Sequence, residues 1–187
     1  MSSFSHQFSL AMNTSGNTFL NMGNANNLQN YLLSRQGRYV VDVDLDIRTS
    51  PIVSAILPFL SFSRYSFDLV LSFQLLEHMP FSIIFDCLRE FKSVRKKYFV
   101  ISLPDMSLSK RNKVKFYIYK YIKHPREWNI YHIRNRDKVH FWEIGYGDIN
   151  LGCLEEKIFL ANLVIMSHFR NNLFPYHHFF VLKIKGD

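Results

Sequence analysis

Hydrophobic and polar positions follow two rhythms along this chain. Short apolar runs, typical of buried strands, alternate with longer stretches in which apolar residues recur every three to four positions, as on one face of a helix. Residues 24–35 and 81–94 carry this helical pattern, and the run FDLVLSF is apolar at nearly every position, which is typical of a strand covered on both faces. Strands are predicted at 18–22, 39–45, 67–73, 98–103, 160–166 and 179–185.

This alternation predicts one α/β domain over residues 1–187, built on a mostly parallel sheet with helices on both faces. Sheets of this kind bind their ligands at the carboxyl ends of the strands. The residues that directly follow each predicted strand are therefore the first candidates for a functional site.

Composition excludes several classes of protein. Hydrophobic residues make up 48% of the chain and charged residues 20%, which excludes a disordered polyelectrolyte. Cys87 and Cys153 are too few for a disulfide scaffold. No apolar run approaches the roughly 20 residues of a membrane-spanning helix, and residues 1–17 lack the pattern of a signal peptide. We therefore expect a cytoplasmic protein without a membrane span.

The net charge of +8 is concentrated in one stretch. Residues 92–138 hold 14 Lys/Arg and 3 Asp/Glu, a net charge of +11, whereas the rest of the chain holds 9 and 12, a net charge of −3. We expect a basic and aromatic insertion at 106–140. Its charges either form a solvated helix face or contact an anionic partner such as RNA, a sugar phosphate or a lipid head group.

Residues that could bind a ligand or take part in catalysis follow three of the predicted strands. Gly23 follows the first strand, where a glycine permits the tight turn that brings a helix N-terminus to an anion. Asp44 stands 21 residues later, the separation at which a carboxylate accepts the ribose hydroxyls of a nucleotide. Glu77 and His78 follow another buried strand. No metal site is predicted with them, because His140 is distant in the sequence and shows no ligand spacing.

Three segments carry a family resemblance. LPF at 57–59, SFDLVLSFQLLEHMP at 66–80 and YFVISLPD at 98–105 resemble, in order and spacing, class I S-adenosylmethionine-dependent methyltransferases of the type 11 group. HFWEIG at 140–145 and PYHHFF at 175–180 resemble tail segments of bacterial members. The resemblance implies a Rossmann-like sandwich with an antiparallel C-terminal strand. It also implies S-adenosylmethionine as the cofactor and methyl transfer to a small-molecule or glycan-type acceptor.

The resemblance implies cofactor-binding roles after the first two strands. Asn21, Gly23 and Asn24 would form the loop under the methionine part of the cofactor, and Asp44 would hold the ribose hydroxyls. The chain departs from the family pattern here, since Asn21 stands where the family has an acidic residue and the later glycines are replaced. The acid that often precedes the LPF segment is also missing at 54–56. A hydrogen bond lost in this way costs about 1–3 kcal/mol when its partner is buried and left unsatisfied.

Roles are also implied after the strand predicted at 67–73. Phe73 and Gln74 would line the cofactor pocket, and Glu77 and His78 would shape the loop beside the transferred methyl group. Methyl transfer relies mainly on proximity and orientation, and a base is required only when the acceptor must lose a proton early. The candidate general bases are His78, His140 and Glu143.

Two alternatives stay open at the level of the sequence. In the first, the chain keeps the methyltransferase fold as a catalytically degenerate binding or partner protein. The altered glycine loop favours this, as does segment 1–17, which we expect to be flexible where the family has a helical cover. In the second, the chain binds or modifies RNA through the basic stretch at 92–138.

Overall fold

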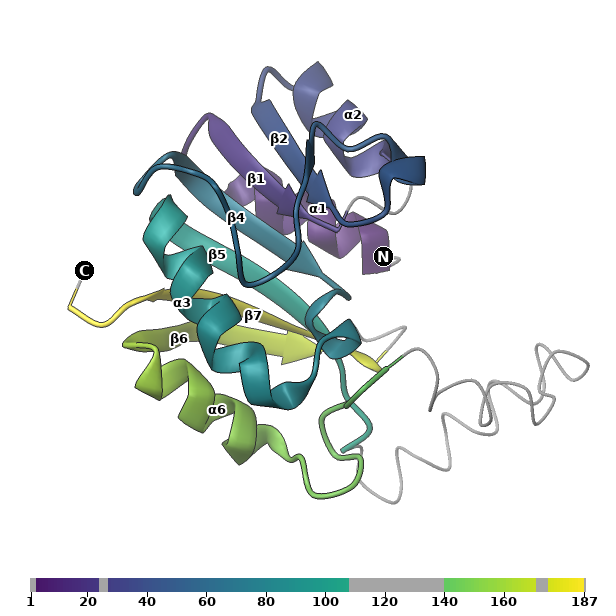
Figure 1. Cartoon of the computed structure of the whole chain (residues 1–187), viewed down its shortest axis with the longest axis vertical. Coiled ribbons are helices and arrows are strands. Elements are labelled where there is room, and N and C mark those ends of the chain that lie inside the picture. The colour runs from purple at the N-terminus through teal and green to yellow at the C-terminus, as the bar shows by residue number, and fades with distance from the viewer. Residues whose placement is uncertain (1–2, 24–26, 108–139, 171–174, 187) are drawn as a thin grey trace, which may run out of the picture.

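The computed structural model describes residues 3–23, 27–107, 140–170 and 175–186. They form a seven-stranded sheet in the order β3-β2-β1-β4-β5-β7-β6, with helices on both faces (Figure 1). The strand pairs are parallel except those of β7, which runs antiparallel to both β5 and β6. The predicted α/β fold with an antiparallel C-terminal strand is therefore confirmed. The strands are β1 Thr18–Met22, β2 Tyr39–Asp44, β3 Val53–Ser54, β4 Phe67–Phe73, β5 Arg95–Pro104, β6 Leu163–Arg170 and β7 His177–Ile184.

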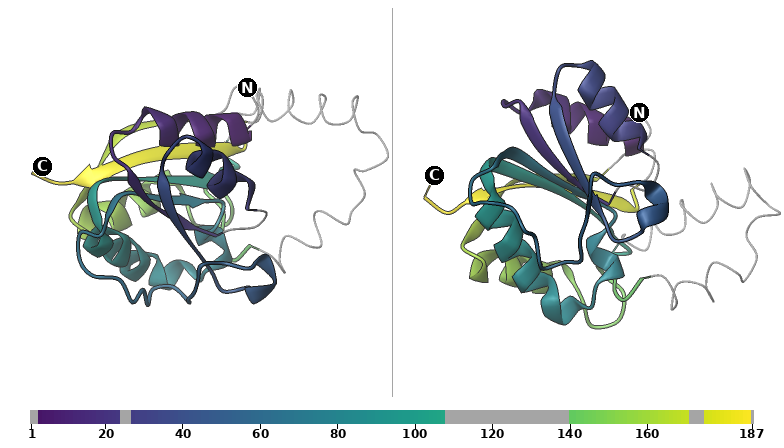
Figure 2. Two further views of the ribbon diagram at one scale, coloured as in Figure 1. Left: turned by 90° about the horizontal axis from the view of Figure 1, so that it is seen from above. Right: turned by 45° about the horizontal axis from the view of Figure 1, so that its top comes forward.

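The helices pack in two layers on opposite faces of the sheet (Figure 2). Along the central strands, side chains alternate between these faces: Phe19 and Leu69 contribute to the cluster under α1 and α2, whereas Leu20 and Val70 contribute to the cluster under α3 and α6. This two-sided burial explains why the central strands are apolar at nearly every position. The helices are α1 Ser3–Asn13, α2 Leu28–Arg35, α3 Ile84–Val94 and α6 Leu151–Leu160, and the 3-10 turns are η1 Ile47–Thr49, η2 Leu76–His78 and η3 Phe81–Ile83. Among the described residues, no helix is long and apolar enough to cross a bilayer.

Segment 1–17, which we expected to be flexible, contains a helix in the part that the structure describes. Ser3–Asn13 form α1, and Ala11 is completely buried against the sheet together with Phe19 and Leu33. The segment after α1 also contacts the sheet, since the backbone N–H of Asn17 donates to Oδ2 of Asp68 at 2.8 Å. A helical cover therefore lies on this face of the sheet.

The strand predicted at 160–166 begins later than expected. Residues up to Leu160 belong to α6, and β6 starts at Leu163 after a turn in which Asn162 takes a left-handed conformation with φ 60°. The side chain of Asn150 caps the start of α6 by accepting a hydrogen bond from the backbone N–H of Cys153 at 3.2 Å.

Candidate functional site

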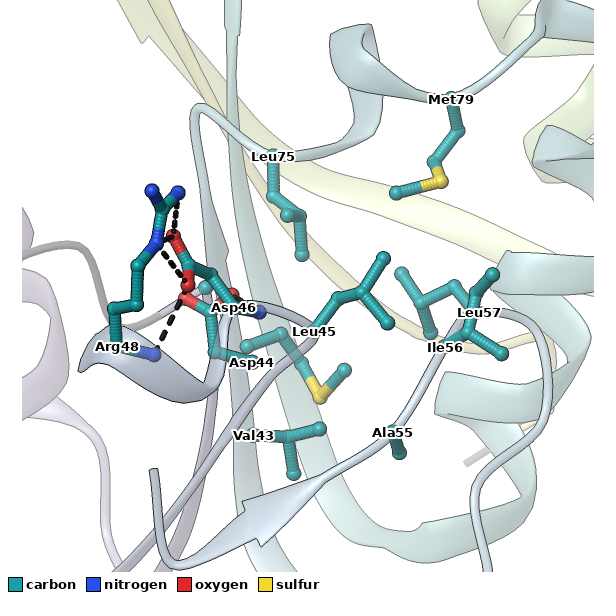
Figure 3. A pocket seen from close by; sticks show the side chains of 12 residues that line it. Val43, Asp44, Leu45, Asp46, Arg48, Ala55, Ile56, Leu57, Leu75 and Met79 are labelled. Carbon is teal, nitrogen blue, oxygen red and sulfur yellow. Dashed lines mark hydrogen bonds and ion pairs between the residues drawn. The ribbon is translucent and has the colours of Figure 1, made fainter. Parts of the chain in front are cut away.

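A cavity of about 280 Å³ opens at the carboxyl ends of β1, β2 and β3 (Figure 3). The turn after β4 closes one side of it through Leu75 and Met79, and Leu45, Ile56 and Leu57 supply apolar walls. Its volume lies just below the range of roughly 300–1,000 Å³ that is usual for small-molecule sites. The residues that line it are Met22, Gly23, Val43, Asp44, Leu45, Asp46, Arg48, Ala55, Ile56, Leu57, Leu75 and Met79.

Gly23 sits where the chain leaves β1 and turns along the cavity wall. Its φ of +83° lies in the left-handed region, and its N–H donates to the carbonyl of Val43 at 2.9 Å. A Cβ at this position would meet Cδ1 of Leu75 at 3.3 Å. The position therefore favours glycine both for its backbone conformation and for the close approach of the turn after β4.

Asp44 ends β2 at the cavity wall, and the loop beyond it carries a tight ion pair. Oδ1 of Asp44 accepts from the N–H of Asp46 at 2.9 Å. Asp46 in turn holds the guanidinium of Arg48, with 2.6 Å between Nη2 and Oδ2 (Figure 3). The side-chain hydrogen bond from Arg48, with a further one from its backbone N–H, lowers the pKa of Asp46 to about 2. The cavity lining thus combines the Asp44 carboxylate and the Asp46–Arg48 ion pair with apolar side chains.

The other residues expected to bind a cofactor take different positions. The amide of Asn21 is buried and donates to Oδ1 of Asn30 at 2.9 Å, which ties β1 to α2. Gln74 has a φ of 53°, and its Nε2 donates to Oγ of Ser102 on β5 at 3.2 Å. Neither side chain lines the cavity, nor does Phe73, whose ring packs edge-on to Phe179. Asn24 lies outside the described residues.

Glu77 and His78 lie on η2, next to the cavity wall, in a second group of polar side chains. Segment 140–143 packs directly on η2: the N–H of Phe141 donates to the carbonyl of Glu77 at 2.8 Å. The indole Nε1 of Trp142 contacts the carbonyls of Leu76 and Met79 at 3.1 and 3.0 Å. On the sequence alone, His140 is set apart from His78 because the two are distant along the chain. In the fold, this packing brings the centroids of their rings to 4.9 Å from one another.

Burial dominates the chemistry of Glu77. Its side chain is completely buried, and neither carboxylate oxygen has a hydrogen-bond partner among the described residues. Burial, with a smaller contribution from the charge of Glu143, raises the pKa of Glu77 to about 8. Glu77 is therefore a carboxyl group in an environment that disfavours its charge unless a cation is present.

Glu143 connects the group to the C-terminal strands. Its Oε1 accepts from the hydroxyl of Tyr176 at 2.7 Å and lies 2.9 Å from Nδ1 of His140. The three candidate bases named from the sequence, His78, His140 and Glu143, thus fall into one group beside the cavity.

A neighbouring network at the end of β5 was not found from the sequence. Asp105 is completely buried and accepts from Arg170, from Ser107 and from Nδ1 of His178, the last at 2.7 Å. Nε2 of His178 lies 2.9 Å from Nδ1 of His168. The two residues belong to segments already singled out in the sequence, His178 to PYHHFF and Asp105 to YFVISLPD. Their contact depends on the pairing of β7 with β5, and on the register that places His178 opposite Leu103. We interpret this network as an anchor for the strand ends.

The basic stretch at 92–138 and the insertion at 106–140 fall largely on residues outside those described. The basic residues at its start have structural contacts, although Lys96 and Lys97 are exposed. Nζ of Lys92 donates to the carbonyl of Ala161, Arg95 is completely buried, and Lys96 faces Asp68 at 3.9 Å.

Comparison with known structures defines the fold. No family model and no curated protein sequence matches the chain. A S-adenosylmethionine-dependent methyltransferase from Mesorhizobium loti is 13% identical, with a TM-score of 0.65 over 96% of each chain. A methyltransferase of the same kind from Methanosarcina mazei is 14% identical, with a TM-score of 0.61 over 99% of this chain and 98% of that one. Magnesium protoporphyrin IX methyltransferase from Synechocystis PCC 6803, with bound S-adenosylhomocysteine, is 12% identical, with a TM-score of 0.62 over 97% of this chain and 80% of that one. The chain therefore has the class I S-adenosylmethionine-dependent methyltransferase fold.

Proposed function

We propose that this chain is an S-adenosylmethionine-dependent methyltransferase that acts on a small-molecule acceptor. The observation that carries the proposal is that Gly23 and Asp44 line one cavity at the carboxyl ends of β1, β2 and β3. In sheets of this kind, ligands bind at that edge, near the point where the strand order reverses. The small-molecule methyltransferases among the structural neighbours support the same assignment.

The residues of the cavity suit the parts of the cofactor. The Asp44 carboxylate can accept hydrogen bonds from a pair of ribose hydroxyls, because an ionised carboxylate offers two acceptor oxygens. The side chains of Leu45, Ile56 and Leu57 form apolar walls of the kind that hold an adenine ring. At Gly23 the backbone passes close to the cavity without a side chain.

S-adenosylmethionine, when bound, supplies a methyl group on a positively charged sulfur. The protein's part is to hold the acceptor in line with that methyl group and to exclude water. Leu75 and Met79 line the cavity and flank Glu77 and His78 in the sequence, so the acceptor would lie on the η2 side. A proton released by the acceptor would pass to the group formed by His78, His140 and Glu143.

Calorimetric titration of the full chain with S-adenosylmethionine and S-adenosylhomocysteine tests the cofactor site. We expect binding of either ligand and a loss of at least tenfold in affinity in Asp44→Asn, which halves the carboxylate's acceptor capacity and removes its charge. Asp86→Asn, on the exposed face of α3, is the matched control and should bind like the wild type. The absence of heat at millimolar ligand with folded protein would exclude the proposal.

Turnover is measured separately, by transfer of a labelled methyl group to a panel of small oxygen and nitrogen acceptors. Transfer that is lost in Asp44→Asn and kept in Asp86→Asn is the expected result. Binding of the cofactor without transfer to any acceptor would instead favour a protein that keeps the fold for binding alone.

A further inference from the structure

We propose that Glu77, His78 and His140 bind a divalent transition-metal ion, with Zn²⁺ as the representative ion, beside the cavity. One donor atom from each of these three residues lies within 4.8 Å of the donor atoms of the other two. Two imidazole nitrogens and one carboxylate oxygen form a ligand set that suits Zn²⁺ and its neighbours better than Mg²⁺ or Ca²⁺. The binding of the metal itself is independent of the methyltransferase proposal.

The Glu77 carboxylate is the observation that points to a cation. The side chain is completely buried, yet both oxygens lack a hydrogen-bond partner in the described part of the chain. Burying a carboxylate without compensation is costly, and buried charges in proteins are either paired or bound to metals. A cation held between this carboxylate and the two imidazoles supplies the missing compensation.

The hydrogen bonds around His140 prepare its ring to act as a ligand. Its Nδ1 lies 2.9 Å from Oε1 of Glu143, and the same oxygen accepts from Tyr176 at 2.7 Å. A carboxylate that accepts from one ring nitrogen leaves the lone pair on the other, which is the arrangement usual for metal-bound histidines. Nε2 of His140 is then the nitrogen whose lone pair is available to a metal.

The backbone fixes the two halves of the site relative to one another. Glu77 and His78 belong to η2, and Trp142 binds the carbonyls of Leu76 and Met79 on either side of them. Neighbouring donor atoms around a tetrahedral Zn²⁺ with bonds of about 2.1 Å stand about 3.4 Å apart. The donor atoms lie within 4.8 Å of one another, so binding requires them to move closer, and the two half-buried histidine rings are the side chains with room to turn.

Three protein ligands leave a fourth position open, as in catalytic zinc sites. If the proposed function holds, this position takes the hydroxyl oxygen of an acceptor and makes its proton more acidic. With a metal bound, the lone pairs of His78 and His140 are used for coordination, so the O–H proton passes to water in place of these rings. The oxygen forms a bond to the methyl carbon, and the bond from that carbon to sulfur breaks to leave a neutral thioether. The substrate class that follows is an acceptor methylated on a hydroxyl oxygen.

Metal binding is tested with the untagged full chain, stripped with a chelator and kept reduced so that both cysteines stay thiols. We expect one equivalent of Zn²⁺ to bind in competition with a chromophoric chelator, and excess Mg²⁺ not to displace it. Affinity should fall at least tenfold in Glu77→Gln and in His140→Ala. His6→Ala, in a histidine on α1, and Cys153→Ser are the matched controls and should bind like the wild type.

Glu77→Gln keeps the shape of the side chain and removes the charge, so it tests the ligand and not the packing. Circular dichroism and a thermal melt verify that each variant is folded. Zn²⁺ affinity that is equal in the wild type, Glu77→Gln and His140→Ala would overturn the proposal, as would the absence of binding by the wild type. Cofactor titration on the same samples separates the two proposals: cofactor binding without Zn²⁺ refutes only the metal site, and Zn²⁺ binding without the cofactor refutes only the methyltransferase.

Discussion

The rings of His78 and His140 lie 4.9 Å apart, although each follows a different strand of the sheet. Trp142 holds this arrangement, since its indole N–H bonds to the carbonyls of Leu76 and Met79 and its side chain is 2% exposed. Segments 76–79 and 140–143 therefore behave as one structural unit beside the cavity.

Replacement of Trp142 by Phe should separate these segments. The substitution keeps an aromatic ring but removes the indole donor from the carbonyls of Leu76 and Met79, of which the first still accepts from the backbone N–H of Met79. We expect the free energy of unfolding to fall by about 1–3 kcal/mol in urea titrations. Phe141→Leu is the control: that ring is 69% exposed, so the change should stay within about 0.5 kcal/mol. Equal stability of Trp142→Phe and the wild type would show that the indole bonds do not hold the segments.

The glycine after β1 offers a test that separates backbone strain from steric contact. Gly23 and Gly37 have similar φ values, +83° and +77°, so an alanine at either position pays about 1–2 kcal/mol for a left-handed backbone. Only at Gly23 does the added Cβ meet Leu75; at Gly37 nothing lies within 4 Å. We expect S-adenosylhomocysteine to bind more weakly to Gly23→Ala and with unchanged affinity to Gly37→Ala, both measured by calorimetry. Equal losses in both variants would count against a role for Gly23 in the cavity.

The lowered pKa of Asp105 leads to a prediction of how the free energy of unfolding depends on pH. Burial works to raise the pKa of Asp105, but hydrogen bonds from His178 and Ser107 and the charge of Arg170 outweigh it and hold the pKa below 3.8. A carboxyl group whose pKa is lowered by folding contributes stability above its unfolded pKa and loses it as the pH falls. We expect Asp105→Asn to lower the free energy of unfolding by roughly 3 kcal/mol at pH 6, and the difference from the wild type to shrink below pH 4.

The measurement is a series of urea denaturations of both proteins between pH 6 and pH 3. Asp86→Asn, which changes a half-exposed carboxyl group on α3, is the control and should follow the wild type within about 0.5 kcal/mol. A constant difference between Asp105→Asn and the wild type across this range would contradict the assignment.

Asn21 stands where the family pattern has an acidic residue, and its contacts explain the exchange. Its Nδ2 donates to Oδ1 of Asn30, whose own Nδ2 donates to Oδ1 of Asn27 at 3.1 Å. An ionised aspartate side chain at position 21 cannot donate the hydrogen bond to Asn30, because it has no N–H group. Thermal or urea unfolding of Asn21→Asp should show a loss of about 1–3 kcal/mol. Asn17→Asp, at a side chain whose Oδ1 accepts from Arg38, should lose less, and the reverse order would refute this explanation.

The sequence by itself determined the kind of fold, because apolar periodicity reports which faces of a segment are buried. The runs at β1, β2, β4 and β5 were predicted for that reason, and the strand ends directed attention to Gly23 and Asp44, which line one cavity. The two-residue strand β3 is too short to leave a pattern. The helix over α2 was predicted, but Leu28 and Tyr31 on its apolar stripe are exposed, whereas Asn30 is buried.

Tertiary structure alone decided which polar groups meet. Gln74 follows β4 as predicted, but its left-handed backbone directs the amide to Ser102 on β5 and away from the cavity. His140 joins Glu77 and His78 because the fold lays segment 140–143 on η2. The physical reason is that burial patterns are local and repeat along an element. Hydrogen bonds and ligand sets depend on distances of a few ångströms between side chains that the strand order and register bring together.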